Sequence, residues 1–249
     1  PAPAASAVGV RHTRALQVLF GGKLPAPCTD GDTRCLVSAR FSGHDGERAS
    51  ALALFDEIGD VVGTEEEHQM EGGFRGTIHI VPELPVGQYK KHLEWVLRAQ
   101  RDIAAFQKAI EEKHGAAVPY RNRALVFRFM RSVGRTTPSA YAANWEVGYN
   151  VSGSLHANAD AVRETIFHEV FHLNDQAHGE WSRRVIGPIV DAIARKCSSK
   201  TPCLTPYAPG KTMVRGGTYY AFQPNNGDIA HEYAAELATR YFTEQRAAL

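Results

Sequence analysis

The residues best suited to chemistry lie at 168–172, where the chain reads His-Glu-Val-Phe-His. On a helix, His168 and His172 are separated by about one turn and project from the same face. Two imidazoles in this arrangement can bind one Zn²⁺, and Glu169 can reach a water molecule held by that ion. So short a pattern also occurs by chance, and the alternative is an ordinary buried helix with two hydrogen-bonded histidines.

A second helix with acidic residues on one face is expected near the C-terminus. Asp228 can cap it, and residues 229–242 follow a helical period. Glu232 and Glu236 are four residues apart, so they share a face of this helix. Glu236 could instead pair with Arg240 on a solvated face, and the carboxylate would then have no role at a metal.

The pattern before His168 predicts alternating strands and helices. Apolar residues at three- and four-residue steps predict a long helix over 87–114. Strand-like runs follow at 124–130, 145–149 and 152–156. The helix that carries His168 then begins, with Asp160 as its expected N-cap.

The N-terminal third is expected to be irregular at first and then β-rich. Residues 1–33 are rich in Pro, Gly and Ala, which predicts an irregular segment. A β-rich region is predicted over 34–82, and Asp56–Asp60 is expected to be a hairpin turn within it. The strand-like runs of this region lie at 35–41, 49–55 and 74–81.

From about residue 74 onward, this order of strands and helices resembles the upper lobe of zincin metallopeptidases. The resemblance implies an α+β, zincin-like fold: a mixed twisted sheet with an edge strand beside the cleft, an active-site helix and a mainly helical lower lobe. The upper lobe would span 83–178 and the lower lobe 179–249. The region 34–82 would be an N-terminal β-rich extension continuous with the upper lobe. Residues 152–158 occupy the place of that edge strand, and its free backbone groups would pair with an extended peptide.

A catalytic zinc ion needs three protein ligands and one open position. In gluzincins the third ligand is a Glu on a later helix. Residues 232–236 read Glu-Tyr-Ala-Ala-Glu and are followed by Tyr241-Phe242, which resembles the Glu-Phe-Phe-Ala-Glu stretch of the anthrax lethal factor-like gluzincins. The resemblance assigns Glu232 as the third zinc ligand and Glu236 as the acidic residue that orients a ligating His.

His178 is the alternative third ligand. His168, His172 and His178 have the spacing of the metzincin signature, and Met213 lies downstream, where that family has its Met-turn. The departure is Asp175, because metzincins have a Gly there that lets the chain leave the helix sharply. If the helix simply continued, His178 would point about 280° away from His168 and could not bind the same ion.

The activity implied is that of a zinc-dependent endopeptidase acting on a peptide or protein substrate. Glu169 would act as the general base toward a zinc-activated water. The oxyanion would need a further donor, for which Tyr219, Tyr220 and His231 are the local candidates and Tyr220 is preferred. A non-catalytic zincin-fold binding module is the alternative from another functional class.

The four cysteines form two close pairs within polar, turn-rich segments. Three pairings are possible, and the two local ones, Cys28–Cys35 and Cys197–Cys203, are favoured. Disulfides form in oxidising compartments, so a secreted or periplasmic protein is expected. The net charge of +1 gives no electrostatic reason to expect nucleic acid or an anionic membrane. No apolar run approaches the roughly 20 residues that span a bilayer.

Overall fold

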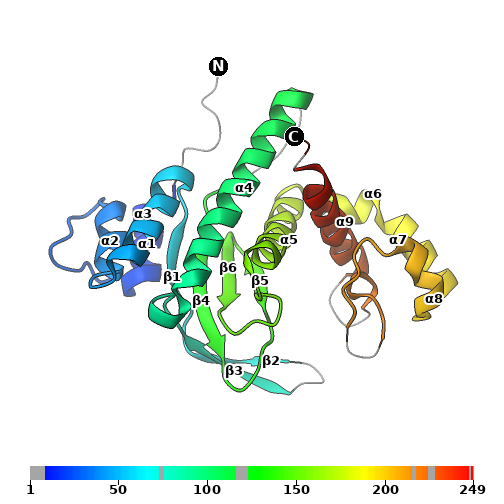
Figure 1. Cartoon of the computed structure of the whole chain (residues 1–249), viewed down its shortest axis with the longest axis horizontal. Coiled ribbons are helices and arrows are strands. Elements are labelled where there is room, and N and C mark those ends of the chain that lie inside the picture. Colours follow the sequence, from blue (N-terminus) through cyan, green and yellow to red (C-terminus); the bar gives the residue numbers. More distant parts are fainter. Residues whose placement is uncertain are drawn as a thin grey trace.

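The computed structural model describes residues 9–72, 76–115, 123–214, 217–223, 228–246 and 248. Within these residues the chain is a mixed α+β protein with a curled sheet, so the expected α+β class is confirmed. Figure 1 shows the sheet in the middle, one group of helices on its N-terminal side and another group beyond α5 on the opposite side.

The N-terminal part is helical, and the sequence-based prediction for it was wrong. Its helices are α1 (His12–Phe20), α2 (Thr33–Arg40) and α3 (Asp45–Ile58). The segment expected to be irregular over 1–33 therefore contains a helix, and the strands expected at 35–41 and 49–55 are α2 and part of α3. These helices pack against the start of the sheet and share its hydrophobic core.

The physical reason is that a short apolar run fits a helix as well as a strand. Asp32 decides the case for α2, because its carboxylate accepts a hydrogen bond from the backbone N–H of Cys35 at 2.8 Å and caps the helix. Leu36 then lies fully buried on the inner face. The hairpin turn expected at Asp56–Asp60 is the end of α3, where Gly59 takes a left-handed φ of 89°.

The sheet is mixed and has six strands among the described residues. They are β1 (Val61–Thr64), β2 (His68–Glu71), β3 (Thr77–Pro82), β4 (Val126–Ser132), β5 (Ala140–Ala143) and β6 (Glu146–Asn150). The order is β2-β3-β4-β6-β5, and β1 pairs with the first half of β4. Strands β1, β4 and β6 are parallel, whereas β5 runs antiparallel at the edge. Phe74 and Arg75 lie outside the described residues, and the strand expected over 74–81 is otherwise β3.

The edge strand is not where the sequence predicted it. Residues 152–158 form turns, and the edge is β5, which forms a hairpin with β6. The side chain of Asn150 accepts a hydrogen bond from the backbone N–H of Ser152 at 3.0 Å, and the Asn150 carbonyl accepts one from His156 Nδ1 at 2.8 Å. Side chains thus occupy the hydrogen-bonding groups that a strand would offer to a neighbour.

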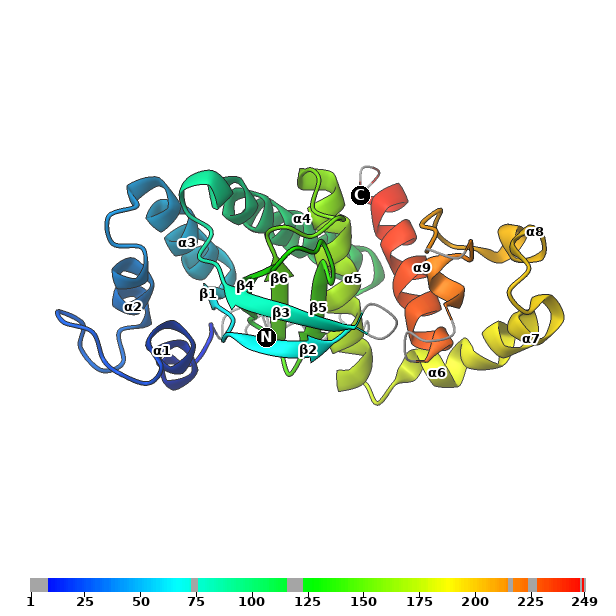
Figure 2. The ribbon, with the colours of Figure 1, turned by 90° about the horizontal axis from the view of Figure 1, so that it is seen from below.

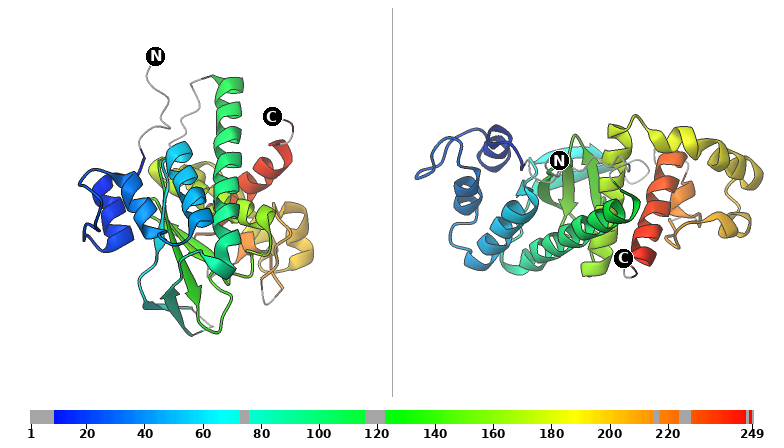
Figure 3. Two further views of the ribbon diagram at one scale, coloured as in Figure 1. Left: turned by 60° about the vertical axis from the view of Figure 1, so that its left-hand side comes forward. Right: turned by 90° about the horizontal axis from the view of Figure 1, so that it is seen from above.

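Two long helices pack against each other and contribute to the same hydrophobic core as the sheet. Figures 2 and 3 show that they cross at a large angle. They are α4 (Lys90–His114), which follows the short 3₁₀ helix η2 (Gly87–Tyr89), and α5 (Ala159–Ala177). The long helix expected over 87–114 is confirmed. The N-cap of α5 is Asn158 rather than the expected Asp160, because Asn158 Oδ1 accepts the backbone N–H of Ala161 at 2.9 Å.

The C-terminal helices lie beyond α5. They are α6 (Trp181–Val185), α7 (Gly187–Cys197), α8 (Thr201–Leu204), η3 (Thr205–Tyr207), η4 (Tyr220–Phe222) and α9 (Ile229–Gln245). Asp228 caps α9 as expected, and its carboxylate accepts the backbone N–H of Ala230 at 2.8 Å. Phe242 stacks on Phe167 with ring centroids 4.2 Å apart, which holds α9 against α5.

Both predicted disulfides, Cys28–Cys35 and Cys197–Cys203, are present. The first closes the loop before α2, and the second joins the end of α7 to α8. Paired cysteines are compatible with an extracellular protein. No helix in the described ranges is long and apolar enough to cross a membrane.

Candidate metal centre

The helix α5 presents two histidines to the C-terminal helices. Its apolar stripe includes Val162, Ile166 and Val170, which are all buried in the core. This packing fixes the rotation of the helix, so that His168 and His172 project from another face toward α9. The orientation of both imidazoles therefore follows from the hydrophobic periodicity of the helix.

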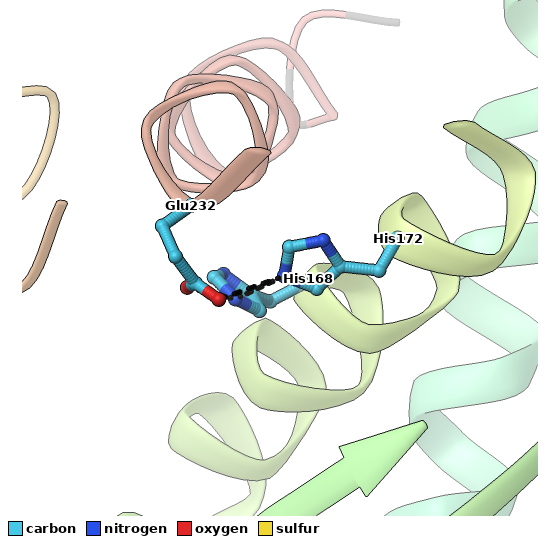
Figure 4. Close-up of side chains that lie close together, drawn as sticks. All are labelled: His168, His172 and Glu232. Carbon is cyan, nitrogen blue, oxygen red and sulfur yellow. Dashed lines mark hydrogen bonds and ion pairs between the residues drawn. The ribbon is translucent and has the colours of Figure 1, made fainter. Parts of the chain in front are cut away.

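The helix α9 brings a carboxylate to these histidines. The helix α9 packs against α5, and Ala234 and Ala235 in its first half are buried. The Phe242–Phe167 stack holds the other end of α9. Glu232, in the first turn, then points at the two imidazoles, as Figure 4 shows.

The three side chains are spaced as ligands of one metal ion would be. His168 Nε2 lies 3.0 Å from His172 Nε2 and 3.3 Å from Glu232 Oε2, and His172 Nε2 lies 3.5 Å from Glu232 Oε1. Ligand atoms bound at about 2.0–2.1 Å in a tetrahedron lie roughly 3.3 Å from one another. The three residues thus form a group that could hold a metal ion.

The electrostatics of the group also favour a cation. Burial alone would raise the pKa of Glu232, but hydrogen bonds and charge from His168 and His172 outweigh it and lower that pKa to about 2. Glu232 therefore stays ionised at neutral pH. Its Oε2 atom is buried and accepts no well-aligned hydrogen bond from any described residue. A buried carboxylate oxygen aimed at two imidazole nitrogens is a donor set that suits Zn²⁺.

Glu236 lies beside His168, on the Nδ1 side of its ring. Its Oε1 is 3.5 Å from His168 Nδ1. A proton on Nδ1 shared with Glu236 leaves the lone pair of Nε2 free for a metal. Burial raises the pKa of Glu236, and the charge of His168 only partly offsets this. Gly210 packs against this carboxylate so closely that an added Cβ would collide with Glu236 Oε2.

Glu169 and Tyr220 border the group. Glu169 follows His168 directly, and burial raises the pKa of its carboxyl, with His168 and His172 opposing the shift. The Tyr220 ring meets the His168 ring edge to face at a centroid distance of 6.0 Å. The neighbouring Tyr219 instead donates its hydroxyl to Thr205 Oγ1 at 3.0 Å. Of the two tyrosines, Tyr220 is therefore the one beside the candidate site.

The structure does not bring His178 to the group. His178 is the C-cap residue of α5, and its Nδ1 lies 2.7 Å from the carbonyl oxygen of Asn174. The helix continues through Asp175, where a metzincin would leave it, so His178 stays on another side. Met213 is 46% exposed rather than packed beneath the candidate ligands. The metzincin alternative thus loses its structural support.

A hollow of about 160 Å³ adjoins the group. His172 belongs to both, and the hollow is also lined by the edge strand β5, the C-terminal half of α5 and the start of α9. Its other lining residues are Ala142, Leu173, Asp175, Gln176, Glu180 and His231. Of these, sequence reasoning had considered only His231 for a role at the site. Residues 140–143 form a short strand directly before a turn that contains Trp145. This short strand is the feature of the sequence from which a role for Ala142 beside the site could have been predicted.

Comparison with known proteins finds no matching family model, no matching curated protein and no matching solved structure. The functional argument therefore depends on the geometry of the site alone. That geometry gives a partly buried His/His/Glu group, an adjacent glutamate, a nearby tyrosine and a hollow that borders a sheet edge.

Proposed function

We propose that the protein is a zinc-dependent endopeptidase of the gluzincin type. The observation that carries the proposal is the convergence of His168, His172 and Glu232 from two helices onto one point, with separations of 3.0–3.5 Å. Two histidines and one carboxylate are the ligand set of catalytic zinc in thermolysin-type sites. The two disulfides support an extracellular or periplasmic location.

Each residue of the site has a defined task in peptide hydrolysis. Zinc bound by the three ligands would supply Lewis acidity and lower the pKa of a water toward about 7. Glu169 would accept the proton of the attacking water and later deliver it to the leaving amine. The Tyr220 hydroxyl would donate a hydrogen bond to the developing oxyanion.

The sheet edge gives the substrate a path to these residues. Ala142 of β5 lines the same hollow as His172. Among the described strands, β5 pairs with β6 alone, so its outer edge could pair with an extended peptide and align a scissile bond with the group. This arrangement favours an endopeptidase, which must bind chain on both sides of the bond.

The mechanism is tested by measuring bound zinc and cleavage of casein for the wild type and the Glu169→Gln variant. We expect the variant to keep stoichiometric zinc and to lose turnover by roughly 10²- to 10⁴-fold, because the general base is lost while the ligands remain. Glu111→Gln, the same change at an exposed position on α4, should leave turnover unchanged. Full activity of Glu169→Gln would refute the mechanism.

The ligand assignment is tested separately. Glu232→Ala should abolish tight zinc binding, whereas His178→Ala should bind zinc as the wild type does. The reverse result would restore the metzincin assignment. A wild type that binds zinc tightly but cleaves neither casein nor a peptide library would instead be a non-catalytic zinc-binding module.

A further inference from the structure

The hollow beside His172 has the size of one side chain. Its volume is about 160 Å³, whereas pockets that take a whole small-molecule ligand usually have at least about 300 Å³. A peptide paired with β5 would direct alternate side chains toward the two faces of the sheet. A side chain near Ala142 on the α5 side would therefore enter this hollow.

The lining combines an apolar wall with a polar mouth. Ala142 and the buried Leu173 provide methyl groups that can cover an aliphatic stem. Gln176 and Glu180 are exposed at the other side and offer an amide and a carboxylate. Such a lining fits a side chain with a long apolar stem and a polar end.

The charge of the hollow away from the candidate metal is negative. Asp175 is 7% exposed, and its two carboxylate oxygens accept hydrogen bonds from Ser182 N at 2.7 Å and Ser182 Oγ at 2.5 Å. Both donors are neutral, so they leave the charge of Asp175 uncancelled. Glu180 forms no ion pair with any described residue, since Arg184 donates to the carbonyl oxygens of His178 and Gly179.

The turn after α5 places Glu180 at this mouth. Gly179 and Glu180 adopt φ angles of 70° and 56°, and the backbone N–H of Glu180 donates to the Asp175 carbonyl at 2.9 Å. The chain therefore folds back over the end of α5, and the Glu180 side chain lies near Gln176. Gln and Lys have the same unbranched Cβ as Glu, so replacing Glu180 with either should leave the backbone energy of the turn about unchanged.

We propose that this hollow is a specificity subsite that binds a lysine or arginine side chain of the substrate. The stem would lie on Ala142 and Leu173, and the cationic end would pair with Glu180 within the field of Asp175. This inference rests on the proposed peptidase function and adds the substrate class to it.

The test uses zinc-loaded protein and fluorogenic peptides that differ at one position, which is Lys, norleucine or Glu. The position is moved along the peptide from three residues before the scissile bond to three after it. At the position that enters the hollow, we expect wild-type kcat/KM to favour Lys over Glu by about tenfold or more. Glu180→Gln should remove most of this preference, and Glu180→Lys should reverse it. Glu111→Lys, the same charge change on α4, should leave the preference as in the wild type.

The outcomes separate the two proposals. Wild-type cleavage with no Lys-over-Glu preference at any position would overturn the subsite and leave the peptidase intact. A preference that survives in Glu180→Lys would also overturn it, because another residue would then carry the preference. Cleavage of no peptide at all would refute the peptidase and the subsite together. Circular dichroism and bound zinc for each variant exclude loss of folding as the cause.

Discussion

A pair of buried histidines makes the fold sensitive to acid. His92 on α4 and His156 after β6 are 3% and 4% exposed. Tyr149 lies between them: its hydroxyl is 2.9 Å from His92 Nδ1, and its ring stacks on His156 with centroids 4.1 Å apart. His156 Nε2 is buried with no hydrogen-bond partner among the described residues. Burial lowers the pKa of each histidine to about 4, and for His92 the charges of His156 and Lys91 add to the effect.

The sign and size of the effect follow from these values. A histidine in the unfolded chain has a pKa near 6.5. Below that pH the unfolded chain binds protons at these two positions, whereas the folded chain does not bind them until the pH approaches 4. The stability these residues contribute is complete above pH 6.5 and is lost as the pH falls toward 4. With a folded pKa of about 4, each histidine lowers the free energy of unfolding by roughly 2 kcal/mol at pH 5 relative to pH 7.5.

The assay is urea unfolding of the metal-free protein at pH 7.5 and pH 5.0, for the wild type and His156→Gln. Glutamine keeps an N–H donor for the Asn150 carbonyl but does not titrate. The pH-dependent loss of stability should therefore shrink by roughly 2 kcal/mol in the variant, or about 0.7 M in the urea midpoint at a slope near 3 kcal/mol/M. The metal-site residues contribute equally to both proteins and cancel in the comparison.

His114→Gln is the matched control, because His114 is exposed at the end of α4. Its pH dependence should equal that of the wild type. The reasoning is refuted if His156→Gln loses as much stability between pH 7.5 and 5.0 as the wild type does.

Three further results are expected. The buried Asp60, whose carboxylate accepts the N–H of Leu125 at 2.7 Å, has a pKa raised by burial to about 8, so its own contribution to stability should fall as the pH rises from 4 to 8, and over this range the urea midpoint of Asp60→Asn should rise relative to that of the wild type. Gly210→Ala should displace the Glu236 carboxylate and weaken zinc binding by about tenfold in competition with a chelator; wild-type affinity would contradict this placement. Saturating zinc at about 1,000 times its Kd should stabilise the wild type by about 4 kcal/mol, or roughly 8–16 °C in Tm, and Glu232→Ala should show no such shift in a calorimetric scan.

The candidate ligands could be predicted because their arrangement is mostly local. Helix geometry alone places His168 and His172 on one face, and the apolar residues between them fix which face is buried. The partner Glu232 required a second helix, and its cap at Asp228 was visible in the sequence. What the sequence did not contain was the packing of Phe242 on Phe167, which decides that the two helices meet at the right height.

The N-terminal helices were missed for a different reason. The run 35–41 is too short to show a helical period, so its apolar residues are compatible with a strand or a helix. The hydrogen bond from Cys35 N–H to the Asp32 carboxylate favours the helix. The edge strand was misplaced because Asn150 uses its side chain and carbonyl to hold residues 152–156 in turns. In both cases a single polar side chain chose between two structures that the apolar pattern allows.

The candidate metal group and the adjoining hollow therefore differ in how well the sequence predicts them. The candidate metal group consists of two histidines four residues apart on α5 and Glu232 on α9. Its arrangement therefore follows from the period of one helix and from the contact between the two helices. The hollow depends on β5, on the left-handed turn at Gly179 and Glu180, and on α9, which are distant in the chain. A left-handed glutamate is an unfavourable choice that no local rule predicts. The residues that would select a substrate can be identified only from the structure, in which the turn at Gly179 and Glu180 brings Glu180 to the hollow beside α5. The Glu180 carboxylate is the reason for proposing a basic side chain as the ligand of this hollow.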